Sequence, residues 1–176
     1  MKTPQSILSD FEKTAEIWRS SLEHYSEEQF ARKPDAHTWS IGQVYNHLVG
    51  GTRRYHLRQI AQCLEGKGTH NAEGKTVPGK ITFALGRFLP ARIKVPPSDA
   101  YTPKQPGGIQ EIRAGLHHLI EAIREAGKAL EGATEIQKTR HFILGALNAR
   151  EWYQLTEMHF RHHLRQKGRL DQFLAG

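Results

Sequence analysis

The sequence has a single cysteine, Cys63, so no disulfide can form within the chain. A lone cysteine is typical of a reducing compartment and excludes a small scaffold held together by disulfides. Long hydrophobic runs are also missing, because no stretch approaches the roughly 18 apolar residues that cross a bilayer. The N-terminus lacks the apolar core of a signal peptide. We therefore expect a cytoplasmic protein without a membrane span.

Blocks of like charge are missing as well. The 25 Lys and Arg residues outnumber the 18 Asp and Glu residues and are spread along the chain, for a net charge of +7. An excess of basic residues suits nucleic acid or another anionic partner, but it also keeps a protein soluble. Because no DNA-reading motif and no interleaving of aromatic and basic residues is present, nucleic acid is the less favoured partner. The length predicts one domain, residues 1–176.

No useful length of sequence shows the period-two alternation of a half-buried strand. Apolar residues recur instead at three- and four-residue steps, as in helices with one buried face. This spacing predicts four helices, at about 3–25, 41–64, 109–129 and 149–173. Ser40 with Gln43, and Asn148 with Glu151, match the capping-box pattern and predict where the second and the last of these helices begin. The predicted fold class is all-α, a four-helix bundle with a long irregular connection between its second and third helices.

That connection, residues 66–108, is rich in Gly, Pro and Lys. A short helical piece is expected at about 81–88. Connections this long inside a compact domain are usually functional or crossovers. In a bundle, a long connection allows the second and third helices to run parallel, since short loops force neighbouring helices to be antiparallel. No specific role follows from its residues.

Histidine is abundant, with 11 residues. His159 and His163 are four residues apart, so in a helix both imidazoles project from one face, as two nitrogen ligands of one metal ion would. That face is also the apolar stripe of the last helix, which includes Trp152 and Leu155. Imidazoles on a buried stripe need a polar partner. A metal ion and an ordinary hydrogen bond both satisfy this need, and the spacing alone does not choose between them.

Other histidines are less well placed. His47 lies about 120° from the centre of the apolar stripe of the second helix, at the edge of the buried face. Periodicity alone would not select it as a ligand. His117 and His118 lie beside the stripe of the third helix, which predicts surface positions.

Three short motifs follow one another along the chain: WSIGQVYNHL at 39–48, GAL at 145–147 with EW at 151–152, and HFRHHLRQ at 159–166. In this order, and within a helical pattern that covers nearly the whole chain, they resemble the DinB-like (DinB/YfiT) superfamily of four-helix-bundle metalloproteins. Each motif is short and only moderately specific. Their combination over about 110 residues is much more so.

The resemblance implies that His47, His159 and His163 hold a divalent metal ion, with zinc and nickel both fitting three imidazoles. His162 matches a frequent position that is not a ligand. Gln166 matches a common residue of the motif, and we predict that it hydrogen-bonds a ligand histidine. Three neutral imidazoles leave a coordination position open, which is typical of a catalytic rather than a structural site.

The superfamily includes enzymes that resemble thiol transferases using a low-molecular-weight thiol, and related isomerases. The implied function is a metal-dependent transferase or hydrolase acting on a small molecule, and a homodimer is expected from the resemblance alone. No Asp or Glu near the motifs shares the face of His159 and His163. The catalytic residues therefore stay unassigned, and the missing general base favours thiol activation over hydrolysis.

A non-catalytic module is the alternative, with a basic surface that binds nucleic acid or an acidic partner. Five arginines close to the motifs motivate it: Arg53, Arg54, Arg58, Arg161 and Arg165. DNA binding that weakens steeply with salt would support this alternative.

Overall fold

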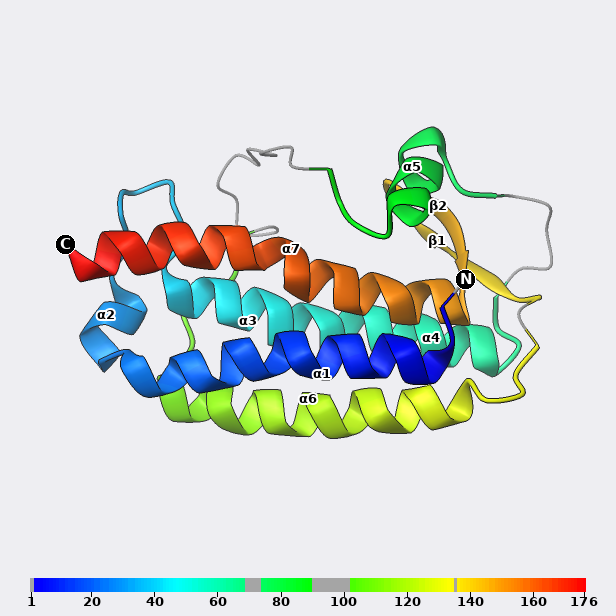
Figure 1. The fold of residues 1–176 in the computed structure, drawn as a ribbon, viewed down its shortest axis with the longest axis horizontal. Coiled ribbons are helices and arrows are strands. Elements are labelled where there is room, and N and C mark those ends of the chain that lie inside the picture. Colours follow the sequence, from blue (N-terminus) through cyan, green and yellow to red (C-terminus); the bar gives the residue numbers. More distant parts are fainter. Residues whose placement is uncertain (1, 69–73, 90–101, 135) are drawn as a thin grey trace.

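The computed structural model describes residues 2–68, 74–89, 102–134 and 136–176. Its long helices are α1 (Pro4–Ser21), α3 (Ile41–Gly51), α4 (Leu57–Leu64), α6 (Ile109–Ala129) and α7 (Ala149–Ala175). A π-helical turn, Thr52–His56, joins α3 to α4, so that the two form one continuous helix (Figure 1). The predicted all-α four-helix bundle is confirmed.

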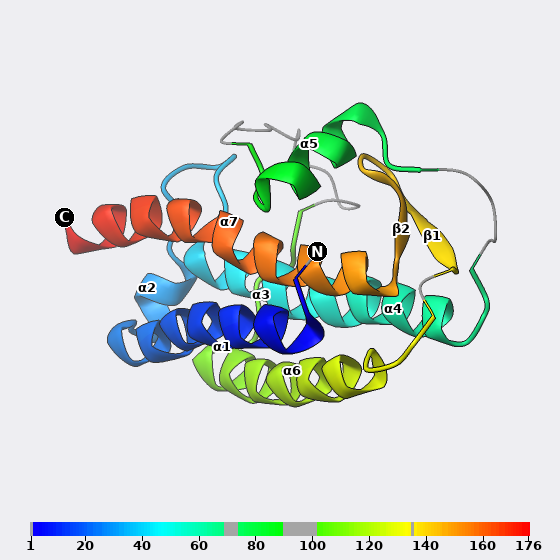
Figure 2. The ribbon, with the colours of Figure 1, turned by 45° about the vertical axis from the view of Figure 1, so that its right-hand side comes forward.

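The four long helices of the bundle lie side by side (Figure 1). α1 packs against α6 and α7, and the continuous α3–α4 helix packs against the same two helices. The chain colours show that α3–α4 and α6 run in one direction while α1 and α7 run in the other (Figures 1 and 2). The neighbouring α3–α4 and α6 helices are therefore parallel, which only a long connection between them permits.

Smaller elements accompany the bundle, and some of them differ from the sequence prediction. A short helix, α2 (Glu27–Ala31), follows α1, and α5 (Val77–Leu85) lies somewhat earlier than the predicted piece at 81–88. Strands β1 (Lys138–His141) and β2 (Gly145–Asn148) form an antiparallel hairpin. The expectation of no strand was wrong here because four-residue strands are too short to show alternation, and every residue of β2 is buried.

Aromatic side chains from three of the long helices meet in the middle of the core. Trp18 of α1 donates a hydrogen bond from Nε1 to the backbone oxygen of Phe160 in α7, over 3.2 Å. Tyr45 of α3 donates from its hydroxyl to the backbone oxygen of Trp18, over 2.7 Å, and their rings meet edge to face. These buried polar atoms are thus paired, and the bonds fix how α1, α3 and α7 are aligned.

The start of α5 is docked on the β1–β2 hairpin. Thr76 donates from its backbone N–H to the oxygen of Leu144, over 3.0 Å, and from its hydroxyl to the oxygen of Ile143, over 2.6 Å. Gly79 lies directly against the hairpin, since a Cβ there would stand 2.1 Å from the oxygen of Leu144. Only a residue without a side chain permits this approach.

Two buried carboxylates of α7 hold the segment around α5. Arg161 donates to both oxygens of Glu157, over 2.6 and 2.9 Å, and also to the backbone oxygen of Gly86, over 2.6 Å. Lys75, which lies just before the start of α5, forms an ion pair with Glu151. Both glutamates are nearly inaccessible to solvent, so each needs its cation. α5 is therefore fixed over α7 and the hairpin, as Figures 1 and 2 show.

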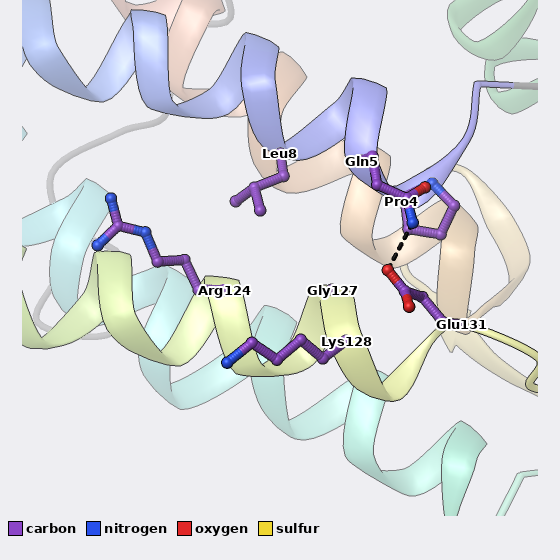
Figure 3. A pocket seen from close by; sticks show the side chains of 7 residues that line it. All are labelled: Pro4, Gln5, Leu8, Arg124, Gly127, Lys128 and Glu131. Atoms are coloured by element: carbon purple, nitrogen blue, oxygen red, sulfur yellow. Dashed lines mark hydrogen bonds between the residues drawn. The ribbon is translucent and has the colours of Figure 1, made fainter.

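A shallow pocket of about 180 Å³ lies between the beginning of α1 and the end of α6 (Figure 3). The pocket is lined by Pro4, Gln5 and Leu8 of α1 and by residues at the end of α6. The side chain of Glu131, just after α6, accepts a hydrogen bond from Gln5. The pocket belongs to the side of the bundle formed by α1 and α6, whereas the histidine motifs lie on α3 and α7. None of the helices in the described ranges combines the length and hydrophobicity that a membrane crossing requires.

Candidate metal centre

His47 is carried by the first half of the continuous α3–α4 helix. The helix begins with the predicted capping box, in which the Ser40 hydroxyl accepts from the N–H of Gln43 and the Gln43 side chain accepts from the N–H of Ser40. Two turns later, His47 points toward α7, with the Trp39 ring 5.2 Å from its own. The cap sets where the helix starts and thereby which side His47 faces.

His159 and His163 are carried by α7, which also begins with its predicted capping box, formed by Asn148 and Glu151. The two imidazoles are one turn apart, and their ring centroids are 4.8 Å from each other. Nδ1 of His163 lies 2.9 Å from the amide oxygen of Gln166. An amide oxygen only accepts, so Nδ1 carries the proton and Nε2 keeps its lone pair.

The three predicted ligands meet at one point between α3 and α7. Nε2 of His47 lies 2.9 Å from Nε2 of His159, although 112 residues separate them in the chain. The His47 ring centroid is 4.9 Å from that of His163. One nitrogen from each of the three rings lies within 4.8 Å of the others, and all three side chains are partly exposed. These three histidines could hold one metal ion.

Burial keeps all three imidazoles neutral. It lowers the pKa of His47 to about 4 and that of His163 to about 3. It also lowers the pKa of His159 far below the usual value, helped by the neighbouring His163 and His47. A neutral imidazole is the form that binds a metal ion, because its lone pair is free.

The donor set fits a divalent cation. Two lone pairs that face each other at 2.9 Å repel unless a proton or a cation lies between them. In tetrahedral coordination with metal–nitrogen distances of about 2.0–2.1 Å, neighbouring nitrogens are about 3.3 Å apart. The His47–His159 pair would open by a few tenths of an ångström to accommodate zinc, and the third nitrogen already lies within 4.8 Å of both. Within the described ranges no carboxylate joins the group, which consists of imidazoles alone. Three imidazoles would leave one position of a four-coordinate ion for a further ligand.

The remaining predicted residues lie where the sequence analysis put them or are already paired. The ring of His162 contacts Phe88, at 5.1 Å, rather than joining the three-histidine group. His117 and His118 are exposed on α6. Of the arginines that suggested a basic surface, four are exposed, whereas Arg161 is bound to Glu157 and the backbone of α5.

Sequence reasoning missed His56. At about 100° per residue, nine residues separate it from His47 by half a turn, which places it on the opposite side of an ideal helix. The π turn Thr52–His56 adds a residue to one turn and rotates His56 toward α7. Its ring centroid lies 5.3 Å from that of His159. Hydrophobic periodicity carries no signal for such a turn, so the residues alone could not have found it.

Comparison with known proteins agrees with this geometry. The family model described as the DinB superfamily matches residues 10–166, a span that includes all three histidines and Gln166. No curated protein and no solved structure matches the chain. Since the family match covers most of the sequence, from within α1 to the end of the last histidine motif, the chain belongs to the DinB superfamily.

Proposed function

We propose that this protein is a divalent-metal-dependent enzyme whose metal ligands are His47, His159 and His163. The observation that carries the proposal is the meeting of three neutral, partly exposed imidazoles from two helices at one point. In a purely structural role, Nε2 of His47 and Nε2 of His159 would share one proton in a hydrogen bond, and such a bond would not explain why His163 presents a third nitrogen at the same point. Membership of the DinB superfamily supports the same reading.

Zinc and nickel are the proposed ions, since both accept three imidazoles and a solvent molecule. A bound cation supplies Lewis-acid activation, lowering the pKa of a thiol or a water molecule at the open position. The chain itself keeps the three imidazoles unprotonated by burial. It also holds His163 in one tautomer through Gln166.

The proposed reaction is transfer of a small thiol to the electrophilic carbon of a second small molecule, with the sulfur–carbon bond replacing the bond to a leaving group. A cation held by the three histidines would allow the thiol to lose its proton to solvent and to attack as its thiolate without a general base. The leaving group would depart with the bonding electron pair and take up a proton from solvent. Hydrolysis needs a base to deprotonate water further or to assist proton transfer, and no carboxylate belongs to the described histidine group. Thiol transfer is therefore preferred to hydrolysis.

Cobalt-substituted protein provides the test. We expect one cobalt per chain and, on addition of a low-molecular-weight thiol, a new sulfur-to-cobalt charge-transfer absorption. His159→Ala should abolish both, while His118→Ala, which changes an exposed histidine of α6, should retain them. Binding of cobalt without any thiol-dependent band would contradict thiol activation. Equal cobalt binding by wild type and His159→Ala would contradict the metal centre itself.

A further inference from the structure

A fourth histidine, which is buried, lies directly beside the three-histidine group. His56 is only 7% exposed, and its ring centroid lies 5.3 Å from that of His159 and 5.8 Å from that of Trp152. It comes from the π turn Thr52–His56, whereas His159 and Trp152 lie seven residues apart on one side of α7. π turns of this kind are rare and occur frequently at functional sites.

The hydrogen bonds around His56 define its tautomer. Nδ1 of His56 lies 3.3 Å from the hydroxyl oxygen of Thr156. That hydroxyl donates its own proton to the backbone oxygen of Trp152, over 3.1 Å, so its oxygen can only accept from His56. The proton of neutral His56 is therefore on Nδ1. Its Nε2 keeps a lone pair and is a hydrogen-bond acceptor.

His159 has the complementary need. Its Nε2 faces Nε2 of His47, the position from which it would bind a metal ion, so its Nδ1 carries the proton. This Nδ1 is buried and has no hydrogen-bond partner among the residues that the structure describes. His163, by contrast, has Gln166 at the same atom. Histidines that bind metal ions nearly always donate their second N–H to an acceptor.

We propose that His56 is that acceptor and is a positioning residue of the metal centre. In this arrangement Nδ1–H of His159 donates to Nε2 of His56, directly after a small ring rotation or through one water molecule. Nδ1–H of His56 then donates to Thr156, and Thr156 donates to the oxygen of Trp152. All donors point the same way along this chain of hydrogen bonds, which ends on a backbone carbonyl. The inference rests on the proposed metal site, because a metal ion bound to Nε2 places the proton of His159 on Nδ1.

An ordinary core histidine would have the same burial, so the test must separate positioning from packing. We choose His56→Leu, which removes the acceptor, and His56→Gln, whose amide can accept from His159 and donate to Thr156. The matched control is His141→Leu. His141 is also a buried histidine in ring contact with Trp152, at 5.4 Å, but its Nδ1 accepts from the backbone N–H groups of Ile143 and Leu144 in the hairpin.

Zinc affinity by chelator competition and the visible spectrum of cobalt-substituted protein are the two readouts. We expect His56→Leu to lower zinc affinity by about 10- to 100-fold and to shift the cobalt bands, with most of both effects reversed in His56→Gln. His141→Leu should lower thermal stability and leave affinity and spectrum unchanged. Wild-type affinity and spectrum in His56→Leu, or no recovery in His56→Gln, would overturn the proposal.

If His56→Leu fails to fold, Thr156→Val serves in its place, since it removes the acceptor for His56 while nearly conserving shape. It should lower zinc affinity and shift the cobalt bands in the same direction, and an unchanged affinity and spectrum would overturn the proposal. A wild-type protein that binds no zinc would instead overturn the proposed function, and this role of His56 with it. The two failures are thus distinguishable.

Discussion

His163 shows how a single hydrogen bond would prepare a nitrogen for the proposed metal ion. Its Nδ1 lies 2.9 Å from the amide oxygen of Gln166, three residues further along α7. This bond fixes the tautomer and the orientation of the ring together, so that Nε2 is presented with its lone pair toward His47 and His159. A ring without such a partner would sample both tautomers and lose part of its affinity.

Replacement of Gln166 by leucine tests this role. Gln166→Leu removes the acceptor, and we expect zinc affinity to fall by about 10- to 100-fold while the helical content is unchanged. Chelator competition measures the affinity. Gln172→Leu is the matched control, because it makes the same change at an exposed position of α7 and should bind zinc as wild type does. Equal affinities in the two variants would show that Gln166 does not orient His163.

Most residues of the site could be named from the sequence, but not all for the same reason. The four-residue spacing of His159 and His163 predicts that they share a helix face, whatever surrounds them. His47 could be named as a candidate ligand only through the family resemblance, because many residues at the edge of an apolar stripe are simply exposed to solvent. His56 could not be predicted, because the π turn that rotates it toward α7 leaves no trace in apolar periodicity.

At the level of the elements, the sequence described α5 only in part. Its existence was expected within residues 66–108, but its docking depends on contacts between distant segments. Gly79 approaches the oxygen of Leu144, and Arg161 of α7 reaches the oxygen of Gly86. Contacts of this kind join residues that are far apart in the chain, so neither apolar periodicity nor turn residues predict how α5 is docked.

Substitution of Gly79 by alanine tests the docking of α5. Helix propensity alone would favour alanine, but the added Cβ would stand 2.1 Å from the oxygen of Leu144 and force α5 away from the hairpin. We expect the free energy of unfolding to fall by about 1–3 kcal/mol, measured by urea denaturation.

Gly168→Ala on α7 is the control for this experiment. No atom lies within 4 Å of a Cβ placed there, so alanine should raise the free energy of unfolding by about 0.5–1 kcal/mol. A Gly79→Ala protein as stable as Gly168→Ala would mean that α5 does not rest on the hairpin in solution.

The elements of the bundle itself followed closely from the sequence. The predicted third helix, 109–129, has the observed bounds of α6, and both capping boxes form where they were predicted. Long amphipathic helices can be predicted because the spacing of their apolar residues and their capping residues are both visible in the local sequence. The β1–β2 hairpin escaped detection because its strands are short and β2 is buried on both faces.

For the whole molecule, the buried histidines make stability depend on pH. Burial lowers the pKa of His47 and His141 from 6.5 to about 4. Below about pH 6.5 the unfolded chain takes up protons that the folded chain does not, so the free energy of unfolding decreases as the pH falls toward 4. Above about pH 6.5 these groups are neutral in both states and contribute no pH dependence.

We therefore expect the metal-free protein to unfold at lower urea concentration at about pH 5 than at about pH 7. His141→Asn should reduce this dependence by about one proton, because the amide oxygen can still accept from Ile143 and Leu144 but does not titrate. Urea titrations at several pH values measure the slope. A slope that is the same in both proteins would contradict a neutral His141 in the fold.

The basic surface is the remaining feature at this scale. The net charge of +7 is real, but Arg161, one of the arginines that motivated a nucleic-acid partner, is bound to Glu157 and to Gly86. The homodimer implied by the family resemblance stays a prediction, to be measured by light scattering. Neither the partner nor the oligomeric state alters the candidate site, because its three proposed ligands come from α3 and α7 of one chain.

Diffraction from crystals grown with zinc, with data collected on both sides of the zinc absorption edge, tests the account most directly. The account predicts one anomalous peak per chain, about 2.0–2.1 Å from Nε2 of His47, His159 and His163. A peak at any other group of residues, or no peak at these three with zinc in excess, would contradict it.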